Sequence, residues 1–345
     1  MEKESSYSMN DFYSIKKIDA HLHYYTYNEA YIRFAQKNNM HLVSINVDFM
    51  EDEWMQLSEQ KKIAGFHKEK SPDIYSYIGA VPLKENISPD VIEKACQQLE
   101  QAIKNKAIGV KIWKNVGMKI SFNDSLVMID NAVFTPLLKC LENLKFPLLG
   151  HFGEPLNCWL PLDKMTVESD KKYYSSHPEF HMNLQPDMPG HADQINACNQ
   201  MLADHPRLNF IGAHLGSSEY SIDEIARRLD KYPNMNMDLA ERVCHLQHQA
   251  ISDHQKVYDF MIKYQDRLIY GSDMVFTDNK SEEEQIRELE RRWISQWQFF
   301  TQTNTQNTWE VNGSFKGLGL PKEVINKIYF GNAIKTYPAL NLKTY

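Results

Sequence analysis

The stretch Ile18-Asp19-Ala20-His21-Leu22-His23, near the N-terminus, is the pattern from which the rest of the chain is interpreted. Apolar and polar residues alternate along it, which is typical of a β-strand. Because successive side chains of a strand point to opposite faces, His21 and His23 should point the same way. Two imidazoles at one strand end form half of a site for a divalent metal. The alternative is a surface strand with two solvated histidines, and ligands at other strand ends would decide between them.

Size and composition narrow the class of protein. The chain has 345 residues with 38 basic and 45 acidic side chains, a formal charge of -7. That length is normal for an α/β barrel with insertions. The sequence contains no block of basic residues of the kind that would predict a nucleic-acid partner. No apolar run approaches the roughly 20 residues that span a bilayer. The polar first fifteen residues lack an apolar signal core, so we expect a cytoplasmic protein. The five scattered cysteines form no CxxC pair and predict neither a thiolate zinc site nor disulfides.

Short apolar runs alternate with helical patterns from end to end. Helices are marked by Ser88-Pro89 as an N-cap with proline at the first position, and by capping boxes at Ser221 and Ser252. This alternation predicts an α/β fold, a (β/α)8 TIM barrel in one domain over residues 1–345 with its core at 16–338. A doubly wound open sheet competes, but no GxGxxG turn follows an early strand. The eight expected strands lie at about 16–23, 41–49, 74–83, 108–113, 146–152, 208–215, 235–240 and 268–271.

Two segments depart from the alternation. Residues 153–190 follow the fifth strand as a long loop with five prolines and many aromatic residues, which predicts a lid or an insertion. Residues 279–320 follow the eighth strand as an insertion that begins with a charged helix. Both are expected near the barrel mouth, as a substrate lid or as packing and oligomer contacts. His177 and His181 in the first segment are expected to be solvated or part of the lid.

Polar residues at the ends of the strands form the candidate site, since barrel enzymes carry their active-site residues there. Any one of these histidines could be a satisfied core residue, but four of them with a terminal aspartate favour a metal-hydrolase site. The candidates at strand ends are His21, His23, Lys111, Trp113, His151, Glu154, His214, Arg242 and Asp273.

The residue types suit one chemistry. A zinc-like ion binds neutral imidazoles and a carboxylate and keeps one position for a water of lowered pKa. Asp273 can ligate the metal and accept the water's proton, and His214 can act as general acid or base. Lys111, Trp113 and Glu154 are candidates for substrate binding. Arg242 joins them, because its planar fork suits a carboxylate, so we expect a small carboxylated substrate.

Six pieces of the chain, in order, resemble a known family. They are IDAHLH, GVKIW, GHFGEP, NFIGAHLG, KYQDRLIYGSD and KIYFGNAIK, and they run from residue 18 to about 336. Their ordered set resembles the amidohydrolase superfamily, specifically the amidohydrolase-related (amidohydrolase 2) branch that contains aminocarboxymuconate-semialdehyde decarboxylase. The resemblance implies metal ligation by His21, His23, His151 and Asp273, with His214 as the catalytic histidine.

The resemblance also implies one divalent metal ion, usually zinc, although manganese and other ions occur in related proteins. Other branches hold two metals bridged by a carbamoylated lysine of the fourth strand, and Lys111 lies on that strand. The more ordinary role for Lys111 is contact with substrate or a carboxylate.

The family does not fix the reaction. The first expectation is hydrolysis of a carboxylated lactone, ester or amide. The alternatives are a non-oxidative decarboxylase on the same scaffold and a barrel that binds metal or ligand without catalysis. A homodimer is expected by analogy with such barrels.

Overall fold

Parallel strands form one curled sheet in the order β10-β9-β8-β7-β4-β3-β2-β1-β11. The computed structural model describes residues 6–50 and 55–342. The ring closes after β10, where Ala20 N donates to Tyr270 O (3.0 Å) and Asp273 N donates to His21 O (2.7 Å). The predicted α/β barrel is therefore confirmed. The strands are β1 (Lys17–Tyr25), β2 (Met40–Ile45), β3 (Tyr75–Ala80), β4 (Val110–Ile112), β7 (Leu148–Gly150), β8 (Phe210–Gly212), β9 (Met235–Asp238), β10 (Leu268–Ile269) and β11 (Val275–Thr277).

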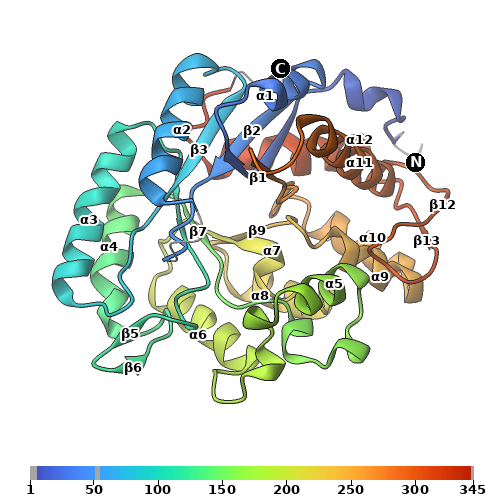
Figure 1. Cartoon of the computed structure of the whole chain (residues 1–345). Coiled ribbons are helices and arrows are strands. Elements are labelled where there is room, and N and C mark those ends of the chain that lie inside the picture. The colour runs from blue at the N-terminus through green and yellow to red at the C-terminus, as the bar shows by residue number, and fades with distance from the viewer. Residues whose placement is uncertain (1–5, 51–54, 343–345) are drawn as a thin grey trace.

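Helices surround the sheet, as Figure 1 shows. A π-helical turn, Lys327–Gly331, joins the last two of them. The charged stretch at about 51–69 predicts a helix in the sequence. In the structure a helix begins there at residue 57, and residues 51–54 lie outside the described part. The helices around the barrel are α1 (Ala30–Lys37), α2 (Leu57–Lys70), α3 (Pro89–Lys104), α4 (Thr135–Leu144), α6 (His191–Asp204), α8 (Ile222–Lys231), α9 (Val243–Ser252), α10 (His254–Lys263), α12 (Lys322–Asn326) and α13 (Asn332–Thr336). The short turn α7 (Ala213–Gly216) follows β8 directly and contains left-handed residues.

Two of the three predicted helix caps are confirmed. The Ser88 hydroxyl accepts a hydrogen bond from Val91 N, and the Ser221 hydroxyl accepts one from Glu224 N. The cap at Ser252 is wrong, because Ser252 is the last residue of α9. The next residue, Asp253, caps α10 instead, and its carboxylate accepts from Lys256 N at 3.0 Å. Asp is as strong an N-cap as Ser, so adjacent candidates are hard to rank from sequence.

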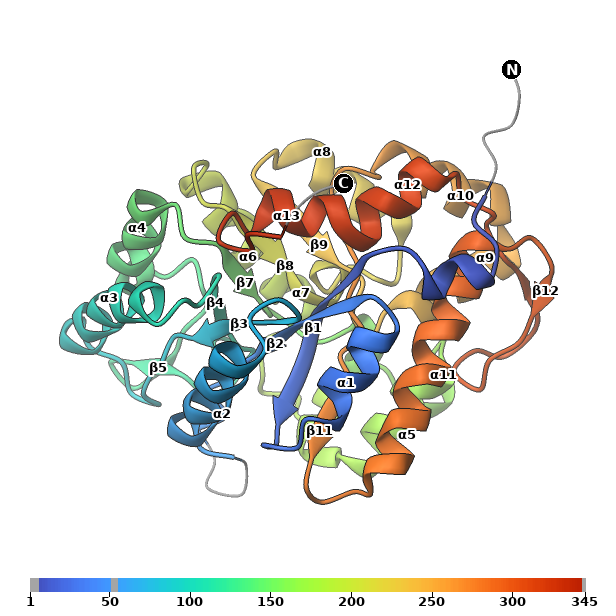
Figure 2. The same ribbon diagram turned by 90° about the horizontal axis from the view of Figure 1, so that it is seen from above.

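A small apolar cluster fills the inside of the barrel. It draws residues from six strands, among them Ile18, Val43, Ile78, Leu149 and Ile269. The same cluster includes residues at the C-terminal end of the chain. In Figure 2, α12 and α13 lie at one end of the barrel, and α5 (Glu168–Ser176) lies beyond the carboxyl end of β1. The 153–190 segment therefore covers the end of the barrel at which the strands have their carboxyl ends.

The 153–190 segment has its own small core. Besides α5 it contains four short 3-10 turns, and Cys158, Tyr174, Phe180 and Met182 pack together within it. His181 is buried, and its Nε2 lies 2.8 Å from Leu160 O. The expectation that His181 is solvated is therefore wrong, because its ring stacks on Tyr174 inside this core, and its alternative role as part of a lid stays a prediction.

The 279–320 segment contains a long helix and a small hairpin. They are α11 (Glu282–Thr301) and the antiparallel pair β12 (Thr305–Gln306) and β13 (Phe315–Lys316). Trp293 and Trp297 of α11 are buried in the main core, and Trp293 stacks on Phe34 of α1 with centroids 5.9 Å apart. Figure 2 shows α11 running beside α1, so this segment is packed onto the barrel wall. A further antiparallel pair, β5 (Ser121–Phe122) and β6 (Ser125–Leu126), follows β4.

His41 in β2 makes the stability of the fold depend on pH. Its Nδ1 lies 3.1 Å from Asp73 O and its Nε2 lies 3.1 Å from Ser76 Oγ, and burial lowers its pKa from 6.5 to about 4. The unfolded chain therefore binds more protons between these two values, so stability is full above pH 6.5 and is lost as the pH falls toward 4. We expect His41 to account for a loss of about 2 kcal/mol between pH 7 and pH 5.

Urea unfolding of the wild type and of His41→Gln at pH 7, 6 and 5 measures this contribution. The free energy of unfolding of the variant should fall less steeply toward pH 5. A difference between the two proteins that is the same at all three pH values would contradict the assignment.

Candidate active site

Three of the predicted metal ligands converge at the carboxyl end of the barrel. His21 and His23 come from β1, and Asp273 follows β10. The Nε2 atoms of both histidines lie 3.3 Å from Asp273 Oδ1. That oxygen is buried and has no hydrogen-bond partner among the described residues. Two ring nitrogens facing one unpartnered carboxylate oxygen form a donor set that suits a divalent metal ion.

Backbone and side-chain acceptors behind the histidines fix their tautomers. His21 Nδ1 lies 2.7 Å from Asp238 Oδ2, His23 Nδ1 lies 3.0 Å from Ile45 O, and His214 Nδ1 lies 3.0 Å from Ala240 O. The bonds to Asp238 and Ala240 place the protons of His21 and His214 on Nδ1, which leaves their Nε2 lone pairs facing inward. His23 Nδ1 also lies 2.8 Å from the Tyr25 hydroxyl, which can donate or accept. This arrangement orients histidine as a metal ligand or as a base.

His151 and His214 lie beside this group. The rings of His21 and His214 have centroids 4.8 Å apart, and those of His151 and His214 are 4.5 Å apart. Neither ring nitrogen of His151 has a hydrogen-bond partner among the described residues. Burial lowers the pKa of His214 and of His21 well below the usual value, and that of His151 to about 4. All three rings are therefore neutral near pH 7, as metal ligation requires.

Strained backbone holds three residues of the site. His214, Glu241 and Asp273 have φ angles of 59°, 57° and 59°, in the left-handed region that L-residues rarely adopt. Such strain persists only where the surroundings enforce it. Here Asp273 N donates to His21 O at 2.7 Å and His214 N donates to Asp238 Oδ1 at 2.7 Å.

Asp238 is the main functional residue that the sequence did not single out. It ends β9, and one oxygen accepts from His21 while the other accepts from the backbone of His214 and Ala240. Its buried carboxylate therefore orients two of the candidate catalytic residues. The available signal was its place at a strand end, but nothing local distinguished it from a solvated aspartate.

Helix α11 reaches the same region from outside the barrel repeat. Arg292 Nη1 donates to Ser272 O at 3.0 Å and also pairs with Glu241. Trp293 Nε1 donates to Asp19 Oδ2 at 2.8 Å, and Asp19 Oδ1 accepts from Ser272 N at 2.9 Å. These bonds connect β1 to the segment that carries Asp273.

All four predicted substrate-binding residues line one cavity of about 320 Å³ above the histidines. Lys111 Nζ lies 3.2 Å from His21 Nε2, and burial lowers its pKa to about 8. Glu154 forms an ion pair with Lys114, which sequence analysis missed. Burial opposes the charge of Glu154, but Lys114 and His151 together outweigh that effect and hold the pKa of Glu154 well below its usual value. The four residues are Lys111, Trp113, Glu154 and Arg242.

Arg242 has unused donors. Its Nη1 lies 3.4 Å from Asp170 Oδ1, and its buried Nε has no hydrogen-bond partner among the described residues. Asp170 is also bound by His245 Nε2 at 3.0 Å and by Asn157 Nδ2 at 2.8 Å. The guanidinium is therefore fixed in place while part of its fork stays available to a ligand.

Comparisons with known proteins identify the fold and the family. Solved structures that cover 94% of this chain include an uncharacterized TIM-barrel protein from Bordetella bronchiseptica (12% identity, 99% of that chain, TM-score 0.56). Others are 2,6-dihydroxybenzoate decarboxylase from Rhizobium (15% identity, 98% of that chain, TM-score 0.53) and 4-oxalomesaconate hydratase from Rhodopseudomonas palustris (14% identity, 96% of that chain, TM-score 0.51). At these identities the likeness shows the fold alone. No curated protein matches the sequence.

The sequence model of one family matches most of the chain. It covers residues 86–339, which include His151, His214 and Asp273 but not the two histidines of β1. No helix within residues 6–50 or 55–342 has the length and apolar composition needed to cross a bilayer. The family model matches well over half of the chain, and the protein therefore belongs to the amidohydrolase family.

Proposed function

We propose that the protein is a metal-dependent hydrolase that acts on a small carboxylated lactone, ester or amide. The observation that supports it most directly is the pair of histidine Nε2 atoms, each 3.3 Å from the unpartnered Asp273 Oδ1, beside the active-site cavity. Neutral imidazoles with one carboxylate suit zinc best, and manganese is the nearest alternative. The cytoplasmic location and the homodimer remain predictions from the sequence.

His21, His23 and Asp273 would hold one divalent ion, with His151 as a further ligand. When bound, the ion would supply a Lewis acid and lower the pKa of a water molecule. Asp273 is placed to accept the proton of the attacking water. His214, whose Nδ1 proton is bonded to Ala240 O, has an Nε2 lone pair that would take this proton from Asp273 and pass it to the leaving group. Lys111 contacts His21 and not a carboxylate, which favours a role in charge balance or substrate binding over a bridge between two metals.

The charges in the cavity favour an anionic substrate. Glu154 is paired with Lys114, Glu241 with Arg292, and Asp170 is shared by Arg242 and His245. No described carboxylate lies within ion-pair distance of Lys111, so its positive charge is left for the ligand. The fork of Arg242 is well suited to bind a carboxylate through two parallel hydrogen bonds.

Turnover of a panel of carboxylated lactones, esters and amides in ¹⁸O-labelled water tests the function. We expect one ¹⁸O atom in the product, and loss of turnover after chelation that metal restores. In Arg242→Met, KM should rise about 10- to 100-fold with a smaller change in kcat, because a charge-assisted pair is lost. Arg242→Lys should recover part of the loss, and an uncharged methyl ester of the same substrate should be almost insensitive to either change.

Two outcomes would contradict hydrolysis. Release of CO2 without ¹⁸O in the product would establish a decarboxylase. Turnover that survives complete removal of metal would exclude a metal-dependent mechanism.

A further inference from the structure

A second, smaller cavity of about 90 Å³ adjoins the active-site cavity, and Trp113 and Lys114 line both. We propose that this cavity, which we call the methionine pocket, binds a short saturated hydrocarbon arm of the substrate whose reacting group lies at the histidines. The inference rests on the proposed function, because it assigns a second part of the same substrate. It predicts a substrate with a carboxylate at one position and a small aliphatic group at another.

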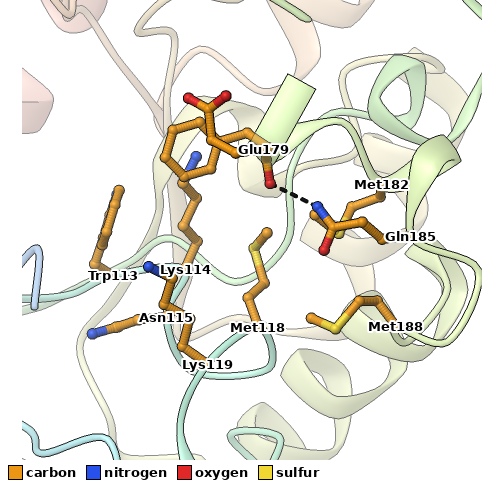
Figure 3. Close-up of a pocket in the computed structure, with 10 residues that line it drawn as sticks. Trp113, Lys114, Asn115, Met118, Lys119, Glu179, Met182, Gln185 and Met188 are labelled. Atoms are coloured by element: carbon orange, nitrogen blue, oxygen red, sulfur yellow. Dashed lines mark hydrogen bonds between the residues drawn. The ribbon is translucent and has the colours of Figure 1, made fainter. Parts of the chain in front are cut away.

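The surface of the methionine pocket is apolar. Figure 3 shows Met118, Met182 and Met188 gathered on one side, with Trp113 and the stem of Lys114 on the other. Phe180 completes the lining. Methionine is flexible and polarisable, so three of them form a wall that adapts to differently shaped aliphatic groups.

Lys114, Asn115, Lys119, Glu179 and Gln185 also line the pocket, and at least three of these side chains are bonded to the protein itself. Gln185 Nε2 donates to Glu179 O at 2.6 Å, the bond drawn in Figure 3. Asn115 Nδ2 donates to Asp48 O at 3.3 Å, and Lys114 is paired with Glu154. These groups would lose their partners if they turned toward a polar ligand. The pocket therefore offers mainly apolar contact, and Figure 3 shows the Glu179 carboxylate pointing away from the three methionines.

Lys114 marks the boundary between the two cavities. Its ammonium group pairs with Glu154, whose Oε2 lies 3.4 Å from His151 Nε2. The same ammonium group lies 4.1 Å from the centroid of the Phe180 ring. Its apolar stem is therefore available to the methionine pocket while its charge belongs to the active site. A ligand that extends past Trp113 passes from charged surroundings directly into apolar ones.

The size of the pocket limits the arm. A cavity of about 150 Å³ holds a benzene molecule, so about 90 Å³ suits a chain of roughly three or four carbons or a small branched group. Trp113 is held by an edge-to-face contact with Phe49, with centroids 5.1 Å apart, and does not swing away easily. An aromatic arm would require the methionines to move.

Straight-chain carboxylates from acetate to octanoate, added to metal-loaded protein with ¹³C-labelled methionine methyl groups, test the proposal. We expect the signals of Met118, Met182 and Met188 to shift only with the longer chains. Affinity should rise about fourfold for each methylene that enters the pocket and then level off. The buried Met261 of the main core, which lies in α10, is the internal control and should not shift.

Two variants separate the contribution of the methionine pocket to ligand affinity from that of the active site. Met188→Trp fills the pocket and should remove the dependence of affinity on chain length, while acetate binds as before. Leu184→Trp is the matched control, because Leu184 is 58% exposed on the neighbouring turn and does not line the pocket. Methionine signals that are unmoved at every chain length, or a chain-length dependence that survives Met188→Trp, would overturn the proposal.

This test does not depend on turnover, so it stands apart from the test of hydrolysis. Loss of acetate binding in Arg242→Met supports the carboxylate site alone. If acetate does not bind the wild type at all, the assignment of a carboxylate site at Arg242 is wrong. In that case 1-alkanols from butanol to octanol probe the methionine pocket with the same readouts.

Discussion

Asp273→Ala is expected to lose its metal ion and to lower kcat/KM by about 10³-fold or more, because one side chain supplies both a ligand and the proton acceptor. Elemental analysis of the wild type should give about one ion per chain. His21→Ala should also lose the ion, since His21 Nε2 faces the same Asp273 oxygen. His214→Ala should keep most of the metal and lose kcat, as expected of a proton-transfer residue. Asp266→Ala is the matched control, because this exposed aspartate pairs, among the residues that the structure describes, only with Lys327 at the surface.

Other outcomes of the same measurement are equally informative. Two ions per chain in the wild type would make Lys111 a bridging ligand. An absence of metal in freshly purified and in reconstituted protein would contradict the catalytic proposal and leave a ligand-binding barrel. Metal that stays bound in Asp273→Ala with an unchanged melting temperature would exclude Asp273 as a ligand.

Asp238→Ala is expected to weaken metal binding by about 10- to 100-fold without changing the number of ions bound at saturation. Asp238 touches no expected ligand atom, but it fixes the Nδ1 proton of His21 and the strained backbone of His214. Removal of its carboxylate also leaves buried N–H groups unpaired, which should lower the free energy of unfolding by about 3 kcal/mol. Competition with a chromophoric chelator measures the affinity, and urea unfolding of the metal-free protein measures the stability.

Asp238→Asn separates the two roles. An amide oxygen can still accept one of the N–H groups, so we expect stability to recover more than metal affinity does. Asp230→Ala, at an exposed ion pair with Lys263, controls for loss of an ordinary aspartate. An affinity for metal that is unchanged in Asp238→Ala would show that the histidines are oriented without it.

The sequence was sufficient for the barrel and for the groups that face the cavity. The strand alternation around His21 and His23 is local, and Asp273 follows from its position after the last apolar run. The residues that orient these groups could not be predicted from the sequence, because their contacts depend on how distant segments of the chain pack together. Asp238 contacts His21 across 217 positions of sequence, and Trp293 reaches Asp19 across 274. No periodicity within a window of residues carries such information.

The hydrogen bonds of Arg292 and Trp293 bear on the order in which the parts of the site become available during synthesis of the chain. The histidines of β1 leave the ribosome first, and Asp273 follows some 250 residues later, as the residue numbers show. Helix α11, whose side chains bind β1 and the segment after β10, ends later still, at Thr301. A nascent chain therefore carries His21 and His23 long before Asp273 completes the donor set. The full donor set therefore requires the contacts of β1 with Ser272 and of α11 with Asp19 and Ser272, which form only after α11 has been synthesised.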